Sequence, residues 1–524
     1  MTTQEPSHTR QDIEDPDHAL KLDNTKDSDN SDDLQLEAAS IASALDGEPF
    51  ETSGEHDLEK VPTEVSHNSY EPATRIATAT DWTGPDDKDN PLTWPLWKKA
   101  YHTLASGSLA FAVTAGSSLI TPGIPQIAEE FGVSRTASVC SLTVFVLGLA
   151  CGPVIAAPIS ETYGRSIVYK ISAPVYILFL VGAGFSKSFA GHLVCRLLAG
   201  TVGAPVLAVG AGTSADVYPQ HNRAVATATF IMMPFLGPSL GPVIGGFAAQ
   251  YKGWRWTQWC TIFIGIFALA LKLGIPGPPK PPVKGWAYVK LLVTITLVRP
   301  VHMLLTEPIV IFLSLYNSFT FSVLFAFFAA YPYTFQLVYD FETWEYGLTF
   351  LGILVGVLLA VLTAIVVDRT VYIPIYKQVL AQGKTAVAPE HRLYIAMVGA
   401  FGIPIGLFWF AWTARRDVHW ISPVLAGIPF AWGNLALFIS SALYLTDVYG
   451  PLNGASAMAA NGLARYTMGA VFPLFTFQMY EVLGIAWASS LLGFISVAMI
   501  PIPWVFFKWG PSIRARSSYD TLKV

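Results

Sequence analysis

The sequence predicts an all-α membrane protein with twelve transmembrane helices in two six-helix bundles. The chain of 524 residues is 52% hydrophobic and only 13% charged, whereas charged residues make up about 25% of a typical soluble domain. From residue 99 onward, apolar stretches alternate with short polar segments, and each stretch approaches the roughly 20 residues that a membrane-crossing helix needs. Short motifs also recur at equivalent places in the two halves of this region.

Changes in composition divide the chain into five segments. Residues 1–95 are polar and acidic, and because such a segment buries too little apolar surface to fold alone, we expect a disordered acidic cytoplasmic tail. The expected segments after it are an N-terminal bundle at 96–274, a Pro- and Lys-rich cytoplasmic linker at 275–305, a C-terminal bundle at 306–508 and a cytoplasmic tail at 509–524. The predicted spans are 100–122, 137–158, 167–186, 190–215, 224–248, 256–274, 308–331, 344–367, 393–413, 420–446, 455–478 and 484–507.

The distribution of basic residues predicts the orientation. Lys and Arg are more frequent in the loops on the same side as the N-terminal tail than in the opposite loops, and such an excess marks the cytoplasmic side. The N-terminal region also lacks the basic and apolar segments of a signal peptide. We therefore expect a multi-pass protein of the plasma membrane with both termini in the cytoplasm.

Two motif pairs indicate an internal repeat. Leu147-Gly148-x-x-x-Gly152 in the second span recurs as Leu351-Gly352-x-x-x-Gly356 in the eighth. The sequence DVYP at 216–219 likewise recurs as DVYGP at 447–451, after the fourth and tenth spans. Matching positions in both halves predict a parallel six-plus-six repeat, with any binding site between the halves near the middle of the membrane.

A glycine- and proline-rich stretch lies inside the fifth predicted span. Three of its glycines recur every fourth residue, so a helix presents them as one flat stripe that a neighbouring backbone can approach. Its prolines each remove a backbone donor and favour a bend. The pattern is typical both of helix packing in any multi-span protein and of a bent gate helix. The residues are Gly237, Pro238, Gly241, Pro242, Gly245 and Gly246.

Further motifs follow in order along the spans. They are DWTGPDDKDNPLTW at 81–94, a Gly-Pro to Gly-Arg loop at 152–165, VCRLLAGTVG at 194–203, the Gly/Pro stretch, and NGLARY followed by FPLF within 461–475. Together they resemble the major facilitator superfamily, and within it the fungal drug:proton antiporter family with twelve spans. The resemblance implies that family's two-bundle fold, alternating access, and export of multidrug or polyamine type in exchange for protons.

The resemblance also implies a gate in the loop between the second and third spans. Glu161 and Arg165 are four residues apart on a tight turn that contains Gly164, where they can pair with each other or with nearby helix ends. In the family such contacts, in the motif that begins at Gly152, latch the cytoplasmic gate. The alternative is an ordinary exposed ion pair, which contributes about 0–1 kcal/mol.

Arg196 lies inside the otherwise uncharged fourth span. A charge within the membrane costs at least roughly 2.5 kcal/mol and usually marks a functional site. We expect Arg196 to face the central cavity and to take part in proton coupling, by shifting the pKa of a nearby group or by ordering water and substrate. The alternative is an anchor whose long side chain reaches the interface.

The proton carrier is not evident from the sequence. Related fungal transporters often have Glu in the seventh span, where this chain has FFAAYP at 327–332. The linker is also shorter than is usual in the family, and Ser166 replaces a basic residue of its loop motif. Without the Glu of the seventh span, no Asp or Glu is predicted near the middle of the membrane.

Polar side chains in the spans of the second half are the candidates for substrate contact, and aromatic neighbours can add apolar and cation–π surfaces. We predict proton-coupled efflux of small, largely apolar organic compounds such as drugs, toxins or secondary metabolites. The alternatives are a polyamine exporter, an uncoupled facilitator and, from another class, a non-transporting membrane sensor. The candidate residues are Asn317, Tyr331, Asn434, Arg465 and Gln478.

The expected partners are a small-molecule substrate, protons and the lipid bilayer, with no nucleic acid, and the protein is expected to be a monomer. No nucleophile triad, metal-ligand cluster or phosphate-binding loop is evident, so we expect no enzymatic activity, no cofactor and no metal site. The four cysteines include no CxxC pair, which favours buried free thiols over disulfides.

Overall fold

The computed structural model describes residues 94–163, 165–218, 223–271, 297–383 and 387–522. Within these ranges every regular element is helical. The described residues all belong to one compact unit, Glu71–Val524. Nearly all of the predicted N-terminal tail and most of the predicted linker lie outside the described residues, so the segment boundaries remain predictions.

The first half of the described chain supplies spans 1 to 6. Span 4 consists of two helices because Pro205, which lacks a backbone N–H, begins the second of them. A short helix, α3, follows span 1. The bounds are α2 (Leu96–Ser118), α3 (Ile124–Phe131), α4 (Arg135–Tyr163), α5 (Arg165–Phe185), α6 (Phe189–Gly203), α7 (Pro205–Val217), α8 (Arg223–Lys252) and α9 (Arg255–Ala270).

The second half supplies spans 7 to 12 and several short helices at their ends. Span 7 is α12, span 8 is α14 and span 9 is α16. The bounds are α11 (Arg299–Thr306), α12 (Pro308–Tyr339), α13 (Thr343–Thr349), α14 (Leu351–Val367), η4 (Asp368–Tyr372), α15 (Ile373–Ala381), η5 (Pro389–Leu393), α16 (Tyr394–Thr413), α17 (Ile421–Leu425), α18 (Gly427–Met499) and α19 (Pro501–Arg514).

Helix α18 contains more than one span. Its 73 residues would form a rod of about 110 Å, far longer than the roughly 30 Å thickness of the hydrocarbon layer. Its backbone leaves helical geometry at Gly450 (φ 62°) and Gly484 (φ 72°), a conformation that glycine adopts without steric cost. The two breaks separate spans 10, 11 and 12, and α19 continues span 12.

The described chain therefore contains twelve apolar helical segments that correspond to the twelve predicted spans. Ten of its helical segments are long and apolar enough to cross a membrane. The last of them, Asn453–Arg514, holds two spans because it breaks at Gly484. Helix α9, with 16 residues, is the remaining span, and the predicted fold class is confirmed.

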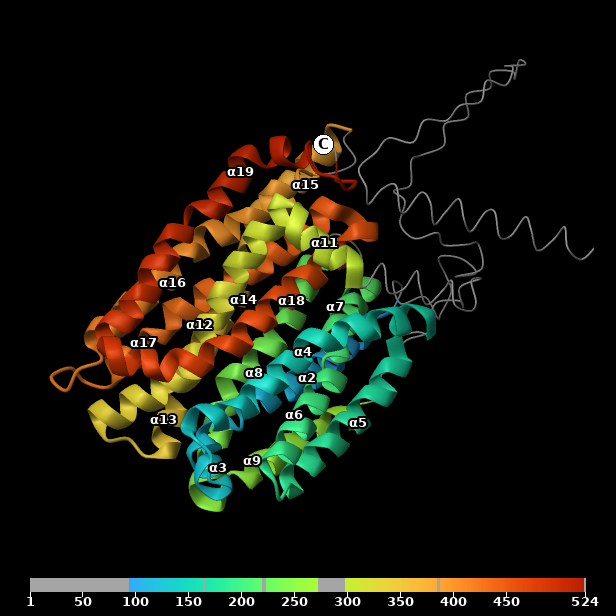
Figure 1. Cartoon of the computed structure of the whole chain (residues 1–524). Helices are drawn as coiled ribbons and strands as arrows, with labels where there is room; N and C mark the ends of the chain where they lie inside the picture. Colours follow the sequence, from blue (N-terminus) through green and yellow to red (C-terminus); the bar gives the residue numbers. More distant parts are fainter. Residues whose placement is uncertain (1–93, 164, 219–222, 272–296, 384–386, 523–524) are drawn as a thin grey trace, which may run out of the picture. The chain divides into compact units, whose positions relative to one another are not determined.

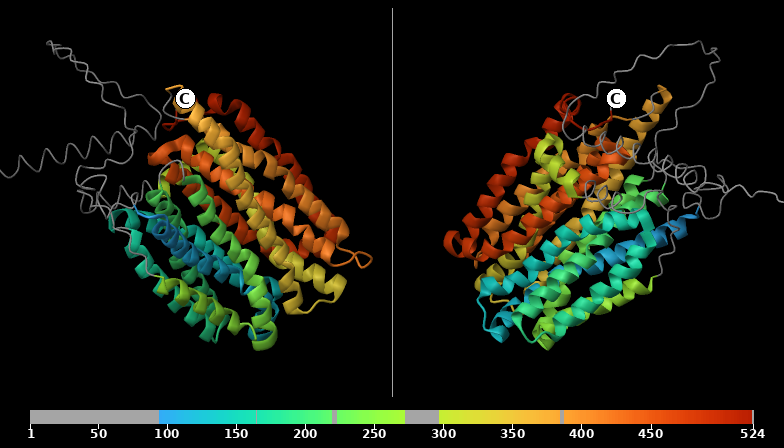
Figure 2. Two further views of the ribbon diagram at one scale, coloured as in Figure 1. Left: turned by 180° about the vertical axis from the view of Figure 1, so that it is seen from behind. Right: turned by 45° about the vertical axis from the view of Figure 1, so that its right-hand side comes forward.

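The helices of each half lie together, as Figures 1 and 2 show. Helices α2 to α9, coloured blue to green, form one group, and α12 to α19, coloured yellow to red, form the other (Figure 2). The groups meet where α18 contacts α4 and where α8 contacts α13 and α14. Spans 2 and 11 therefore form one contact between the halves, and spans 5 and 8 form the other.

The repeated Leu-Gly motifs make equivalent contacts. A Cβ added to Gly148 on α4 would lie 2.5 Å from the carbonyl oxygen of Leu197 on α6, and one at Gly352 on α14 would collide with the carbonyl of Val424 on α17. Span 2 thus packs on span 4 as span 8 packs on span 10. The second glycine of each motif, Gly152 or Gly356, packs against the same neighbour one turn further along.

The cysteines are free, as predicted, but they are not buried. Cys151 is exposed, and the other three are partly exposed. The prediction of buried thiols was wrong because an apolar stretch in a membrane protein has an outer face that lipid covers, so an apolar setting in sequence does not require burial inside the protein.

Candidate functional site

The glycine stripe of the fifth span packs against the first span. Gly237, Gly241 and Gly245 face α2, where a Cβ at Gly241 would collide with Ser118 and one at Gly245 with the carbonyl of Leu119. The Ser118 hydroxyl donates a hydrogen bond to the Gly237 carbonyl (2.9 Å). The two backbones are thus in direct contact, which only glycine permits.

Another face of the same stretch meets the second half. A Cβ at Gly246 would lie 3.0 Å from the Thr343 carbonyl oxygen on α13, and one at Gly347 would lie 2.6 Å from the Pro242 carbonyl oxygen. Pro238 and Pro242 both lie inside α8. Helix α8 therefore packs closely against a helix of its own half and against a helix of the other half. Its role as a gate helix stays a prediction.

Arg196 on α6 is completely buried, with 0% of its surface exposed. Its Nε donates to the Ser141 carbonyl (3.1 Å) and its Nη1 to the Gly116 carbonyl (2.8 Å), and its guanidinium lies 4.2 Å from the Phe145 ring centre. No described carboxylate forms an ion pair with it. Because the side chain ends inside the N-terminal half, the anchoring alternative is not supported. Its part in proton coupling stays a prediction.

Arg465, in the eleventh span, is a second buried cation, with 8% of its surface exposed. Its guanidinium lies 4.6 Å, 4.5 Å and 4.3 Å from the ring centres of Phe321, Phe438 and Tyr466. Its Nε is buried without a hydrogen-bond partner. Among the described residues, no carboxylate neutralises this charge.

Two asparagines accompany Arg465. Asn461, one helical turn before Arg465, donates weakly to the Ser314 hydroxyl (3.4 Å), and its Oδ1 has no partner. Asn317 is 2% exposed, and neither its Oδ1 nor its Nδ2 has a partner. Because Ser314, Asn317 and Phe321 lie on one face of α12, spans 7 and 11 enclose a polar region lined with aromatic rings.

Tyr331 and Asn434 are also buried, but they contact other helices of the second half. The Tyr331 ring stacks on Phe410 (5.2 Å between ring centres), and its hydroxyl has no partner. The Asn434 Nδ2 donates to the Thr320 carbonyl (3.4 Å). The structure thus places Asn434 near the polar region on α12, and Tyr331 within an aromatic cluster.

Gln478 connects the two halves at one end of the spans. Its Nε2 donates to the Thr136 hydroxyl on α4 (2.6 Å), and beside it the Arg135 guanidinium lies 3.8 Å from the Phe477 ring centre. A pocket with about 600 Å³ of empty space opens here between α4, α12 and α18. We name it the outer pocket, because its end is predicted to face away from the cytoplasm.

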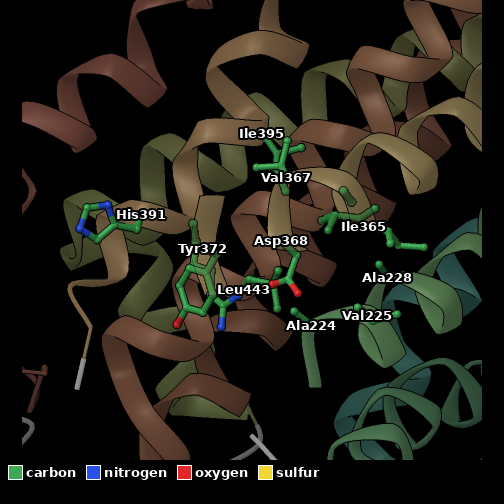
Figure 3. A pocket seen from close by; sticks show the side chains of 13 residues that line it. Ala224, Val225, Ala228, Ile365, Val367, Asp368, Tyr372, His391, Ile395 and Leu443 are labelled. Carbon is green, nitrogen blue, oxygen red and sulfur yellow. Dashed lines mark hydrogen bonds and ion pairs between the residues drawn. The ribbon is translucent and has the colours of Figure 1, made fainter. Parts of the chain in front are cut away.

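A second pocket, the inner pocket, lies between the halves at the other end of the spans. It has about 360 Å³ of empty space, and Figure 3 shows Ala224 and Ala228 of α8 across from Ile365 and Asp368. Tyr346 at the start of span 8 lines the outer pocket and Asp368 at its end lines the inner one. The intervening 17-residue α14 separates them by about 25 Å.

An ionic cluster closes the inner pocket on the side of the second half. The Arg392 guanidinium donates to Asp447 (2.8 Å) and to Asp368 (3.4 Å), and it lies 3.6 Å from the Tyr372 ring centre. This cluster ties the ends of spans 8, 9 and 10 together. A salt bridge that is largely buried in this way is costly to break by removing one partner.

The predicted loop gate of the first half lies at the limit of what the structure describes. Glu161 is on α4 and Arg165 begins α5, but their side chains and the whole of Gly164 lie outside the described residues. Gly152 packs against span 4, so its described role is helix packing. The latch formed by Glu161 and Arg165 stays a prediction.

Comparison with known proteins decides the family. A family model described as Major Facilitator Superfamily matches residues 107–473. The chain belongs to the major facilitator superfamily. The match begins inside span 1 and ends inside span 11, so it covers parts of both halves, including the glycine stripe of α8, Arg196 and Arg465.

The superfamily members most similar to this chain include fungal transporters. Polyamine transporter 4 of Saccharomyces cerevisiae is 40% identical over 484 residues, covering 84% of this chain and 73% of the relative. The efflux pump FUBT of Fusarium oxysporum is 36% identical, covering 83% of this chain and 76% of the pump. The citrinin biosynthesis cluster MFS transporter mrr1 of Monascus ruber is also 36% identical, covering 87% of this chain and 96% of the relative. These relatives are transporters, not enzymes.

Solved structures of superfamily transporters share the fold. A D-xylose–proton symporter superposes with a TM-score of 0.58 at 16% identity, covering 78% of this chain and 97% of the symporter. The human organic anion transporter MFSD10 gives a TM-score of 0.53 at 15% identity, covering 78% of this chain and 100% of that transporter. At these identities the likeness concerns the fold alone.

Sequence reasoning missed two groups in this transporter. In the sequence, Arg392 is one of the basic loop residues that predict the cytoplasmic side. Its partner Asp447 was indicated by the repeat of the Asp216 motif at 447–451. The other group is the ion pair between Arg514 and Glu390 (3.0 Å). No local signal predicted it, because the two residues are 124 positions apart.

Proposed function

We propose that this transporter exports small, largely apolar organic compounds, driven by protons that enter as the cargo leaves. The two halves would rock about a central site, so that the inner and outer pockets open alternately. Efflux pumps and biosynthesis-cluster transporters among the relatives support export as the direction. The expected location is the plasma membrane, with both termini in the cytoplasm.

The observation that carries this proposal is the pair of pockets at opposite ends of the interface between the halves. Each pocket is lined by helices of both halves, so a rotation of one half against the other widens one pocket as it narrows the other. Between them lie the buried polar groups around Arg465. A central site with an opening toward each side is what alternating access requires.

The test is transport in proteoliposomes with an imposed pH gradient. We expect a neutral, fluorescent apolar dye to accumulate against its own gradient when protons flow the other way, and not after a protonophore is added. Dye transport that is the same with and without the pH gradient would indicate an uncoupled facilitator instead. No transport of any dye, together with loss of cellular function on deletion of residues 1–80, would favour a sensor.

Polyamine export is the second candidate. It is favoured by the name of the relative from Saccharomyces cerevisiae, which is 40% identical to this chain. The central groups argue against it, since a buried cation repels a polycation, and the described acidic residues of the second half lie near helix ends. Gradient-driven exchange of radiolabelled spermidine, stronger than that of a neutral dye, would establish this candidate instead.

A further inference from the structure

We propose that Arg465 binds an anionic group of the cargo, so that organic acids with an aromatic or other apolar body are substrates of this transporter. The inference rests on the proposed export function and adds the charge of the compound to it. It starts from a buried cation for which the described chain offers no counter-ion.

The guanidinium of Arg465 differs from the other buried guanidinium groups. Those of Arg392 and Arg514 approach carboxylates at 2.8 Å and 3.0 Å, and that of Arg196 donates to two carbonyls. Arg465 has neither kind of partner in the described chain, although arginine stays protonated in proteins. A buried unpaired charge is costly, and an anionic ligand removes that cost when it binds.

The aromatic rings around Arg465 fit the rest of such a ligand. Phe321, Phe438 and Tyr466 come from spans 7, 10 and 11, and all three ring centres lie within 4.6 Å of the guanidinium carbon. Rings that face a guanidinium stabilise its charge partly while leaving N–H groups at its edge to donate to a carboxylate in the bidentate manner. The same rings provide apolar walls for the body of the ligand.

Unused polar groups beside the cation support a ligand site. Asn317 has an unpartnered amide, and the Oδ1 of Asn461 is unpartnered as well. Buried polar atoms are normally satisfied, so several unsatisfied ones near one cation indicate a place where a partner binds. Amide N–H groups can donate to a second oxygen of an acid, and amide oxygens can accept from a hydroxyl.

The test compares an acid with its uncharged amide. Binding of 2-naphthoate and of 2-naphthamide to the purified full chain is measured by isothermal titration calorimetry near neutral pH. We expect 2-naphthoate to bind at least about tenfold more tightly, as a charge-assisted hydrogen bond predicts. Arg465→Gln should weaken 2-naphthoate by at least about tenfold and leave 2-naphthamide within about twofold, whereas Arg465→Lys should keep part of the preference.

The matched control is Arg415→Gln, which removes an exposed arginine of a loop ion pair with Asp417 (3.5 Å) and should change neither affinity. Equal affinities of the wild type for acid and amide would overturn the proposal, and so would absence of 2-naphthoate binding at millimolar concentration. Retention of the full acid preference by Arg465→Gln would overturn it as well, and if that variant does not fold, the reduced preference expected of Arg465→Lys decides instead. Gradient-driven export of a neutral dye is measured separately, so a failed acid preference with intact dye export overturns only this inference.

Discussion

Arginine appears in three buried settings in this molecule, and each setting implies a different task. Arg392 and Arg514 pair with carboxylates at the helix ends, where they hold spans together. Arg196 donates hydrogen bonds to backbone carbonyls of the first two spans, which hold its positive charge inside the N-terminal half. Arg465 is surrounded by three aromatic rings and has no carboxylate partner among the described residues, and for this setting we propose the binding of an anionic ligand.

Arg196 gives a prediction at this scale. We expect both Arg196→Ala and Arg196→Lys to lower gradient-driven dye transport by at least about tenfold, since an alanine removes the charge and a lysine cannot reproduce the fixed fork of donors. Initial rates in proteoliposomes measure this, with Arg415→Lys as the surface control. Wild-type transport by both variants would show that Arg196 has no part in coupling.

At the scale of the element, glycine decides how closely helices approach. The stripe on α8 brings that helix against α2, and the motif glycines of α4 and α14 bring spans 2 and 8 against spans 4 and 10. Helices of a membrane protein gain little from the hydrophobic effect within lipid, so close van der Waals contact and interhelical hydrogen bonds hold them together. The same contacts leave room for sliding, because small residues do not interlock.

The stripe makes a stability prediction with an internal control. Gly245→Ala should lower the unfolding temperature of the protein in detergent, because the new methyl group collides with the Leu119 carbonyl and overpacking of this kind costs about 1–3 kcal/mol. Gly462→Ala should be neutral or slightly stabilising, since nothing lies within 4 Å of the added Cβ. Equal unfolding temperatures for the two variants would contradict the role of the stripe.

The C-terminal segment after α19 connects helix ends of the second half. Glu307, 1% exposed at the start of α12, accepts hydrogen bonds from Tyr449 (2.9 Å), the Ser517 hydroxyl (2.7 Å) and the Ser518 backbone N–H (3.0 Å). Two of these three donors come from the C-terminal segment. The carboxylate is thus satisfied only while that segment is in place.

Deleting residues 517–524 should therefore lower the unfolding temperature, because Glu307 keeps only the Tyr449 donor to Oε2 and its Oε1 loses the Ser518 N–H. A buried acceptor left without a partner costs about 1–3 kcal/mol. In a Glu307→Gln background the same deletion should cost less, because no charge is left unsatisfied. Unfolding temperatures of the four proteins form a double-mutant cycle. Additive losses would mean that the segment and Glu307 are not coupled.

At the scale of the whole molecule, contacts between the halves set the conformation. The outer end is joined by Gln478 and Thr136 (2.6 Å) and by Tyr346 and Pro122 (3.4 Å), and the middle by the Thr143 hydroxyl and the Ala470 carbonyl (2.9 Å). Opening toward the outside requires the first two contacts to separate. They are exposed or single hydrogen bonds, so the barrier they add is small.

Locking that end should stop transport. In a Thr136→Cys/Gln478→Cys double variant, a short bis-methanethiosulfonate bridge should abolish dye export, and a reducing agent should restore it, because the outer pocket can no longer open. Each single cysteine variant, which retains the four native cysteines, is the control and should export dye at the same rate with and without the bridging reagent. Export that continues after complete cross-linking would rule out movement at this end.

The sequence by itself determined the membrane class, the twelve spans and the two-fold repeat. Hydrophobic length and glycine spacing are local properties of a segment, and they decide whether it can form a helix across the lipid bilayer. The sequence also marked Arg196, Arg465 and the Gly/Pro stretch, since charges and helix breakers are conspicuous in apolar spans. Only the tertiary structure decided which partners these groups have. Arg196 donates to carbonyls of two other helices, Arg465 contacts aromatic rings but no carboxylate of the described chain, and Arg514 pairs with a carboxylate 124 positions away. Such pairings depend on how helices distant in sequence pack, and hydrophobic periodicity carries no information about that.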